Sequence, residues 1–207
     1  MVPREVKEVV RTDDPDVALM LLCKGGDDVA FSQLVEKYED RVLGLAYRYL
    51  GDRGLAEDMA QEAFLRVYRA RGRYEPRAKF STWLYRIVVN LALNELRWQR
   101  GRPSVALAVK TETSSNVNID HTDSGLLPPM ETLEKEELAV RIREIVMELP
   151  ENQRIAILLN KFEDLSYEET AEAMEMSVAA VKSLLTRARV KIKERLLPYL
   201  GEDVHAM

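Results

Sequence analysis

One stretch without a hydrophobic period, residues 101–129, divides this chain of 207 residues into two blocks. Its sequence, GRPSVALAVKTETSSNVNIDHTDSGLLPP, is rich in Ser, Thr, Asn and Pro. Because a segment of this length without regular structure is too long for a loop inside one compact domain, it predicts a linker between two domains. The predicted parts are an N-terminal extension (1–15), a first domain (16–100), the linker (101–130), a second domain (131–200) and a C-terminal tail (201–207).

The apolar residues of both blocks recur at helical spacing, and runs of alternating β-branched residues are few. The sequence therefore predicts an all-α fold of two small helical domains joined by a flexible linker. Clusters rich in Gly and Asp, such as KGGD and GDRG, mark the ends of the expected helices. These helices cover residues 16–24, 28–50, 55–70 and 82–100 in the first block, and residues 131–148, 153–162, 167–174 and 178–197 in the second.

Composition excludes several classes of protein. Apolar residues make up 46% of the chain, yet no apolar run approaches the roughly 20 residues that span a bilayer, so we expect no membrane insertion. The first residues lack the apolar core of a signal peptide, which favours a cytoplasmic location. A single Cys23 with the distant His121 and His205 cannot form a zinc site, and we expect no metal and no cofactor. No nucleophile, base and orienting group occur together, so an enzyme is not expected.

The net charge of -5 conceals a segregation of charge along the chain. Residues 66–102 contain 10 Lys and Arg against 2 Asp and Glu, and residues 178–207 contain 6 against 3. A localised basic surface is typical of a protein that binds a polyanion such as nucleic acid. Charge alone leaves open a second interpretation, in which both segments are solvated helix faces.

The second basic segment follows a pair of short helices with a tight corner. Ser166 and Glu169 have the spacing of a capping box, which predicts a helix from Tyr167, and Ser177 can cap the next helix. That helix has a predicted core stripe of Val181, Leu185, Ala188, Ile192 and Leu196. Its opposite side carries Ala179, Ala180, Lys182, Ser183, Thr186 and Arg187. Small and basic side chains there suit the major groove of DNA, although a helical hairpin with a cationic face has the same pattern.

The helix expected over residues 55–70 leaves one apolar side chain, Leu65, on its polar side. An exposed leucine among polar residues is typical of a surface that binds a partner helix. Its predicted core stripe is Met59, Ala60, Ala63, Phe64, Val67 and Tyr68. The polar side consists of Asp58, Gln61, Glu62, Leu65, Arg66 and Arg69.

The loop over residues 71–80 combines basic and aromatic side chains, the combination that binds single-stranded nucleic acid. Its members are Arg71, Arg73, Tyr74, Arg77, Lys79 and Phe80. The helix that follows adds guanidinium and amide groups at helical spacing, from Arg86, Asn90, Asn94 and Arg97. A protein that reads only duplex DNA has no need of such a loop, whereas one that holds a melted strand does.

Three segments, DMAQEAFLRVYRA, FSTWLYRIVVNLALNELR and LPENQRIAILLNKFEDLSYEETAEAMEMSVAAVKSLLTRAR, together resemble a known family. They are similar, in this order, to regions 2 and 4 of bacterial RNA polymerase sigma factors of the extracytoplasmic-function (ECF) type, which keep only these two domains. The resemblance covers roughly residues 16–200. It implies a dissociable subunit that binds core RNA polymerase, directs it to the minus-35 and minus-10 elements of promoters and promotes promoter melting, with no catalysis of its own.

The resemblance also implies roles for the residues singled out above. The face that would bind core polymerase comprises Asp58, Gln61, Glu62, Leu65, Arg66 and Arg69. The melted minus-10 strand would be held by Arg71, Arg73, Tyr74, Arg77, Lys79, Phe80, Ser81, Arg86, Asn90, Asn94 and Arg97. The minus-35 duplex would be read by Ser177, Ala179, Ala180, Lys182, Ser183, Thr186, Arg187 and Arg189. Factors of this type are usually held inactive by an anti-sigma factor, which is a further expected partner.

Two positions depart from the family pattern, and two other interpretations remain. Glu175 stands where the corner commonly has Gly, and Leu184 stands where Arg is frequent. A helix-turn-helix regulator that acts without polymerase would explain residues 131–197 but would leave the basic loop and Leu65 without a role. A helical adaptor with no DNA role would explain neither basic segment.

Overall fold

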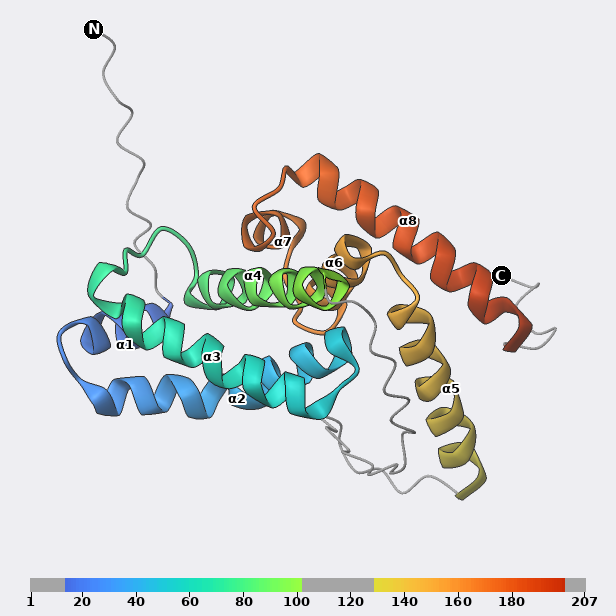
Figure 1. The fold of residues 1–207 in the computed structure, drawn as a ribbon, viewed down its shortest axis with the longest axis horizontal. Helices are drawn as coiled ribbons and strands as arrows, with labels where there is room; N and C mark the ends of the chain where they lie inside the picture. The colour runs from blue at the N-terminus through green and yellow to red at the C-terminus, as the bar shows by residue number, and fades with distance from the viewer. Residues whose placement is uncertain (1–13, 102–128, 200–207) are drawn as a thin grey trace, which may run out of the picture.

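The computed structural model of the protein describes residues 14–101 and 129–199. Figure 1 shows that these residues form helices joined by short turns, and they contain no β-strand, so the all-α prediction is confirmed. The first block consists of α1 (Pro15–Lys24), α2 (Asp28–Leu50), α3 (Arg53–Ala70) and α4 (Phe80–Gly101). The second consists of α5 (Pro129–Met147), α6 (Glu151–Lys161), α7 (Tyr167–Ala173) and α8 (Val178–Leu196). The predicted linker lies almost entirely outside the described residues.

Side-chain caps fix where the helices begin. Asp14 accepts from the backbone N–H of Asp16 at the start of α1 and, through its other oxygen, from the N–H of Phe80 at 3.1 Å, so one carboxylate joins α1 to α4. Both halves of the predicted capping box are present, because Ser166 and Glu169 each accept from the other's backbone N–H. Ser177 caps α8 as expected, accepting from the N–H of Ala180.

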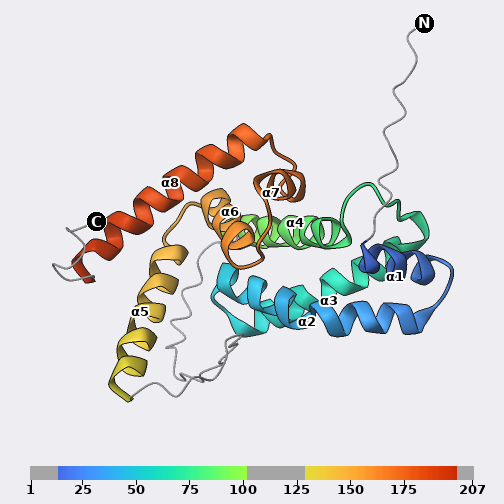
Figure 2. The ribbon, with the colours of Figure 1, turned by 180° about the vertical axis from the view of Figure 1, so that it is seen from behind.

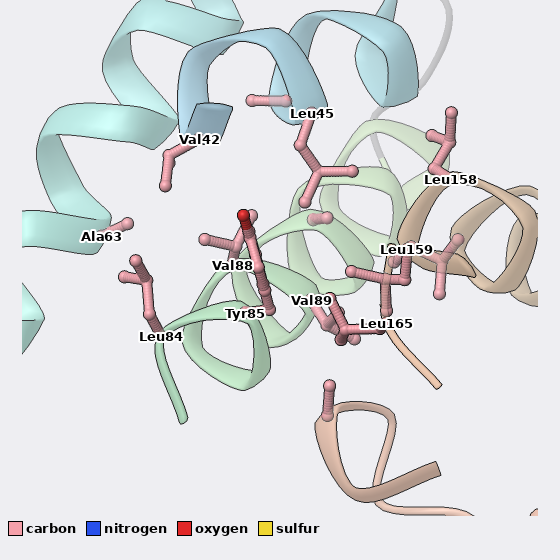
Figure 3. Close-up of a cluster of buried hydrophobic side chains, with 14 of the residues drawn as sticks. Val42, Leu45, Ala63, Leu84, Tyr85, Val88, Val89, Leu158, Leu159 and Leu165 are labelled. Atoms are coloured by element: carbon pink, nitrogen blue, oxygen red, sulfur yellow. The ribbon is translucent and has the colours of Figure 1, made fainter. Parts of the chain in front are cut away.

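The first block is a bundle in which α2 and α3 lie side by side and α4 packs against both (Figures 1 and 2). Its fully buried side chains include Leu34, Val42, Phe80, Leu84 and Tyr85. Figure 3 shows Leu84 on the side of α4 that faces α3. The predicted α3 stripe is confirmed apart from Tyr68, which stays half-exposed and donates a hydrogen bond to Asp28.

The second block has its own apolar stripe. Val181, Leu185 and Ala188 of α8 are buried against α6 and α7, as predicted, whereas Ile192 and Leu196 are only partly covered. In α6 every residue from Arg154 to Leu159 is buried, which is more than one amphipathic face can account for. The helix is therefore covered on both sides, by its own block and by the other one.

The two blocks pack together through α4, which contacts α7, and through α2, which contacts α5 and α6 (Figures 1 and 2). Val89 of α4 lies near Leu159 and Leu165 of the second block (Figure 3), and all three are buried in one continuous core. The sequence analysis did not predict this contact. Within the two described ranges no helix is long and apolar enough to cross a membrane.

Candidate nucleic-acid and partner interfaces

The polar side of α3 faces outward, as the sequence predicted. Asp58, Gln61, Arg66 and Arg69 are exposed and Glu62 is half-exposed, while Leu65 presents 48% of its surface to solvent. Arg66 donates to the carboxylate of Glu62 at 2.7 Å, and this hydrogen bond is the main cause that lowers the pKa of Glu62. The surface therefore holds one exposed apolar side chain among fixed charges.

Leu65 also lines a groove of about 650 Å³ between α2 and α3. The apolar side chains lining it include Phe31, Val35, Leu43 and Phe64. Three exposed carboxylates, those of Glu39, Asp40 and Glu57, also line it. An apolar floor with acidic side chains beside it is suited to an amphipathic helix that carries basic residues.

Sequence reasoning missed the α2 half of this groove, although a signal for it exists. Phe31, Val35 and Leu43 recur at multiples of four residues, directly beside the buried stripe that contains Leu34 and Val42. A helix with two adjacent apolar stripes has more apolar surface than one packing contact covers. The second stripe is the part left open in the groove.

The aromatic residues of the basic loop are buried, which corrects one expectation. Tyr74 is 2% exposed with its ring 4.9 Å from that of Trp83, and Phe80 is fully buried with its ring 5.4 Å from that of Tyr38. Burial raises the pKa of Tyr74 to about 12. Neither ring is available to stack on an unpaired base in this arrangement, because both fix the loop to the core of the first block.

The basic residues of the loop stay at the surface, but three of them have intramolecular partners. The Arg71 guanidinium lies over the Tyr68 ring at 3.6 Å, Arg77 pairs with Glu75, and the Lys79 ammonium is 2.8 Å from a carboxylate oxygen of Glu169 in α7. Arg73 is exposed. Lys24 of α1, which the sequence analysis did not single out, donates to the carbonyl oxygen of Tyr74 at 2.8 Å and adds a cation beside this loop.

The predicted polar side of α4 continues from the loop. Asn90, Asn94 and Arg97 are exposed, whereas Ser81 and Arg86 are half-buried. Arg86, Asn90, Asn94 and Arg97 follow one another at spacings of three or four residues, which places them on one side of α4. Loop and helix together form a basic and amide-rich surface along the first block.

The predicted DNA-reading side of α8 is open to solvent. Lys182, Ser183, Thr186 and Arg187 are exposed, as is Ala179, while Ala180 is half-buried. Arg189 differs from them, because it donates to Asn160 Oδ1 at 3.2 Å and to the Tyr167 hydroxyl at 3.3 Å. The same contact lowers the pKa of Tyr167. Arg189 therefore fixes α8 to α6 and α7 in this structure.

The two departures from the family pattern have structural counterparts. Glu175 has a φ of 54°, in the left-handed region that normally favours Gly, so the corner keeps the usual backbone shape with a side chain in place. Leu184 is half-buried and packs against the core. Leu184 therefore contributes to packing of the core, in addition to any contact with DNA.

Comparison with known proteins agrees with this geometry. The chain matches two family descriptions, Sigma-70 region 2 over residues 34–102 and Sigma-70, region 4 over residues 139–192. It is 38% identical to the RNA polymerase sigma-H factor of Pseudomonas aeruginosa, covering 92% of this chain and 98% of that protein. It is 36% identical to the ECF RNA polymerase sigma-E factor of Haemophilus influenzae, covering 89% and 97%.

A solved structure has a similar fold. The chain resembles CnrH in complex with the cytosolic domain of CnrY, with 25% identity, a TM-score of 0.64 and coverage of 91% of this chain and 100% of that one. Sequence relatives match over nearly their full length, and the region 2 and region 4 matches coincide with the two helical blocks. The chain belongs to the ECF family of RNA polymerase sigma factors.

Proposed function

We propose that this chain binds core RNA polymerase through α3 and the groove beside it, and directs the enzyme to promoters that it reads at two separate elements. The loop and outer side of α4 would hold the melted minus-10 strand, and the outer side of α8 would read the minus-35 duplex. The chain itself would catalyse no reaction, and it would act in the cytoplasm, where polymerase and promoter DNA are found.

The observation that carries this proposal is the groove between α2 and α3. A regulator that bound only a duplex operator would use the helix-turn-helix of α6 to α8, and the open apolar surface on the first block would have no role. Leu65 and Phe64 lie on its α3 side and Phe31 and Val35 on its α2 side, with carboxylates nearby. Apolar surface left open at this position favours a protein partner.

The DNA contacts are supported by exposure and charge. On α8, Lys182 and Arg187 are the exposed cations of the first three turns, next to the small Ala179 and Ser183. Small side chains near the start of a helix let its backbone approach base edges closely, and cations bind guanine or phosphate. On the first block, Arg73 and Lys24 provide charge beside the half-buried loop. With its aromatic residues buried, the loop would hold the strand mainly through phosphates.

An anti-sigma protein is a further proposed partner. CnrH, whose fold this chain shares, is seen in complex with the cytosolic domain of CnrY. A competitor that carried an amphipathic helix with basic residues would fit the groove between α2 and α3, and would then exclude polymerase from the same surface.

The proposal is tested by transcription in vitro. Purified chain is added to core RNA polymerase with a library of genomic promoter fragments, and run-off transcripts are sequenced. We expect initiation from a limited set of promoters that share two short elements, and weak binding of duplex DNA by the chain alone. No measurable affinity for core polymerase would contradict the proposal and would favour the helix-turn-helix regulator.

A further inference from the structure

Two glutamates of the second block reach across to the first block, and the better buried of them is Glu163. It is 4% exposed, on the connection between α6 and α7. Its carboxylate accepts a hydrogen bond from the hydroxyl of Tyr85 in α4 and another from Nε of Arg41 in α2, at 3.1 Å. One side chain of the second block therefore binds two helices of the first.

The connection is shaped to present this carboxylate. Asp164, the next residue, has a left-handed backbone with a φ of 53°, and Asn160 of α6 donates to the carbonyl oxygen of Leu165 at 2.8 Å. Leu165 is buried near Val89 of α4 (Figure 3). The turn thus presents a carboxylate to α2 and α4 and an apolar side chain to α4 (Figure 3).

The second glutamate, Glu169, uses its two oxygens for two tasks. Oε2 accepts from the backbone N–H of Ser166 at 2.8 Å, which completes the cap of α7. Oε1 lies 2.8 Å from Nζ of Lys79, a residue of the basic loop. The Glu169 carboxylate therefore binds the Lys79 ammonium, the group that we propose binds a DNA phosphate.

The two contacts differ in strength for a physical reason. The Lys79 side chain is 64% exposed, and an ion pair in contact with water contributes little, because solvent screens it. The Tyr85 hydroxyl is buried, and loss of its acceptor leaves a donor without water, which costs much more. Of the two, Glu163 therefore makes the stronger contact, and Glu169 makes a weak contact that another anion can replace.

We propose that the described arrangement is a closed state of the free chain, in which Glu163 holds the second block on α2 and α4 while Glu169 occupies Lys79. The phosphates of a DNA strand would compete with Glu169 for the ammonium, so that strand binding and separation of the blocks favour each other. This inference rests on the proposed function for the identity of the competing anion, whereas the closed state itself is independent of it. Neither contact involves the outer side of α8.

The closed state is tested on the free, full-length chain by double electron–electron resonance. Spin labels are placed at Ala18→Cys in α1 and Glu172→Cys in α7, two exposed positions on helices that both pack against α4. Cys23 is buried, so it reacts slowly with the label. We expect one narrow distance distribution for the parent chain.

Three variants should open the chain to different degrees. Tyr85→Phe removes the buried donor to Glu163, and should raise the ratio of open to closed molecules about tenfold. Glu163→Ala should raise it at least as much. Glu169→Gln keeps an acceptor for the cap but loses the charge that binds Lys79, and should raise the ratio about two- to fivefold. Glu168→Gln, an exposed neighbour on the same turn of α7, is the matched control and should leave the distances unchanged.

A second measurement separates opening from misfolding and tests the role of the anion. Lys79→Gln combined with Glu169→Gln should open the chain no further than either change alone, because both remove the same contact. Single-stranded oligothymidylate should lengthen the distances in the parent, and less so in Lys79→Gln. Unchanged distances in all three opening variants, or a broad distribution in the parent, would overturn the closed state. A chain that failed to bind core polymerase would contradict the proposed function and leave these distances as they are.

Discussion

Arg154 of α6 donates a hydrogen bond from Nη1 to the backbone carbonyl oxygen of Tyr49, 2.8 Å away at the end of α2. Its Nη2 donates to the carbonyl oxygens of Met147 and Leu149, at the end of α5 and just beyond it. The side chain is 9% exposed, and desolvation lowers its pKa. One buried guanidinium therefore satisfies three carbonyl groups where α2, α5 and α6 meet.

Replacing this guanidinium should be costly. Arg154→Ala leaves three buried carbonyl oxygens without their donor and opens a cavity, and we expect the free energy of unfolding to fall by about 2–4 kcal/mol. Urea denaturation followed by circular dichroism measures this change. Lys161→Ala, at an exposed position of the same helix, should stay within about 0.5 kcal/mol of the parent. Equal losses in both variants would mean that the cost does not come from the carbonyl contacts of Arg154.

The proposed polymerase surface is tested by Leu65→Asp. A carboxylate at this position of the groove would be desolvated against the partner and would add to the acidic side chains already present, so affinity for core polymerase should fall at least about tenfold. Fluorescence anisotropy of a labelled chain measures the affinity. Val29→Asp, an exposed apolar position outside the groove lining, is the control. If Leu65→Asp also weakened binding of minus-35 duplex, the surface assignment would fail.

Binding of minus-35 duplex should depend on two cations of α8. Lys182→Ala and Arg187→Ala should each weaken binding, and each contact to phosphate that is lost should reduce the slope of log affinity against log salt by about 1. Lys193→Ala, near the far end of the same helix, should have a smaller effect. Full affinity in both of the first two variants would move the reading surface elsewhere on the second block.

The buried carboxylate of Glu163 predicts a pH dependence of stability. Burial raises its pKa above the ordinary value of 4.5, against the opposing effects of Tyr85, Arg41 and Arg48. The folded chain therefore binds this proton more tightly than the unfolded chain, so the stabilisation is complete below pH 4.5 and is lost as the pH rises through the raised pKa. Glu163→Gln cannot ionise, and it should be more stable than the parent at neutral pH.

Urea denaturation at several pH values measures this difference. The stability advantage of Glu163→Gln over the parent should shrink as the pH falls toward 4.5, because Glu163 of the folded parent is then uncharged too. Glu168→Gln is exposed and should follow the parent throughout. A stability advantage that did not change with pH would come from hydrogen bonding and packing of the amide, and ionisation of Glu163 would then make no contribution.

The corner before α8 should be improved by glycine. Glu175 adopts a left-handed backbone that costs a residue with a side chain about 1 kcal/mol, so Glu175→Gly should raise the free energy of unfolding by up to about that amount. Thermal denaturation measures the gain. Because Glu175 lies outside α8, affinity for minus-35 duplex should stay unchanged. A loss of stability would indicate that the Glu175 side chain makes a favourable contact that outweighs the strain.

Local features of the fold could be predicted from the sequence because local physics determines them. The caps by Ser166 and Ser177 and the buried run of Val181, Leu185 and Ala188 depend on residues a few positions apart. Exposure of Leu65 followed from the same helical period. Periodicity assigns a face correctly when one side of a helix meets one layer of neighbours.

The remaining features depend on partners far away in the sequence. Tyr74 and Phe80 were expected at the surface because they occur in a basic loop, yet Tyr38 and Trp83 enclose them. The attachment of the blocks joins Glu163 to a tyrosine 78 residues away, and no spacing rule connects such positions. The one sign of this contact in the sequence is the run of consecutive apolar residues in α6, because a single amphipathic face needs fewer.

The double use of the Glu169 carboxylate restricts which substitutions this position can accept during evolution. Aspartate is one methylene shorter, glutamine keeps the acceptor for Ser166 but not the charge for Lys79, and alanine keeps neither. A change from glutamate to glutamine would therefore weaken the association of the two blocks, while α7 would still begin at the same residue. Variation at this single position would then change how readily such a chain opens on a promoter, without any change in the residues that we propose contact DNA.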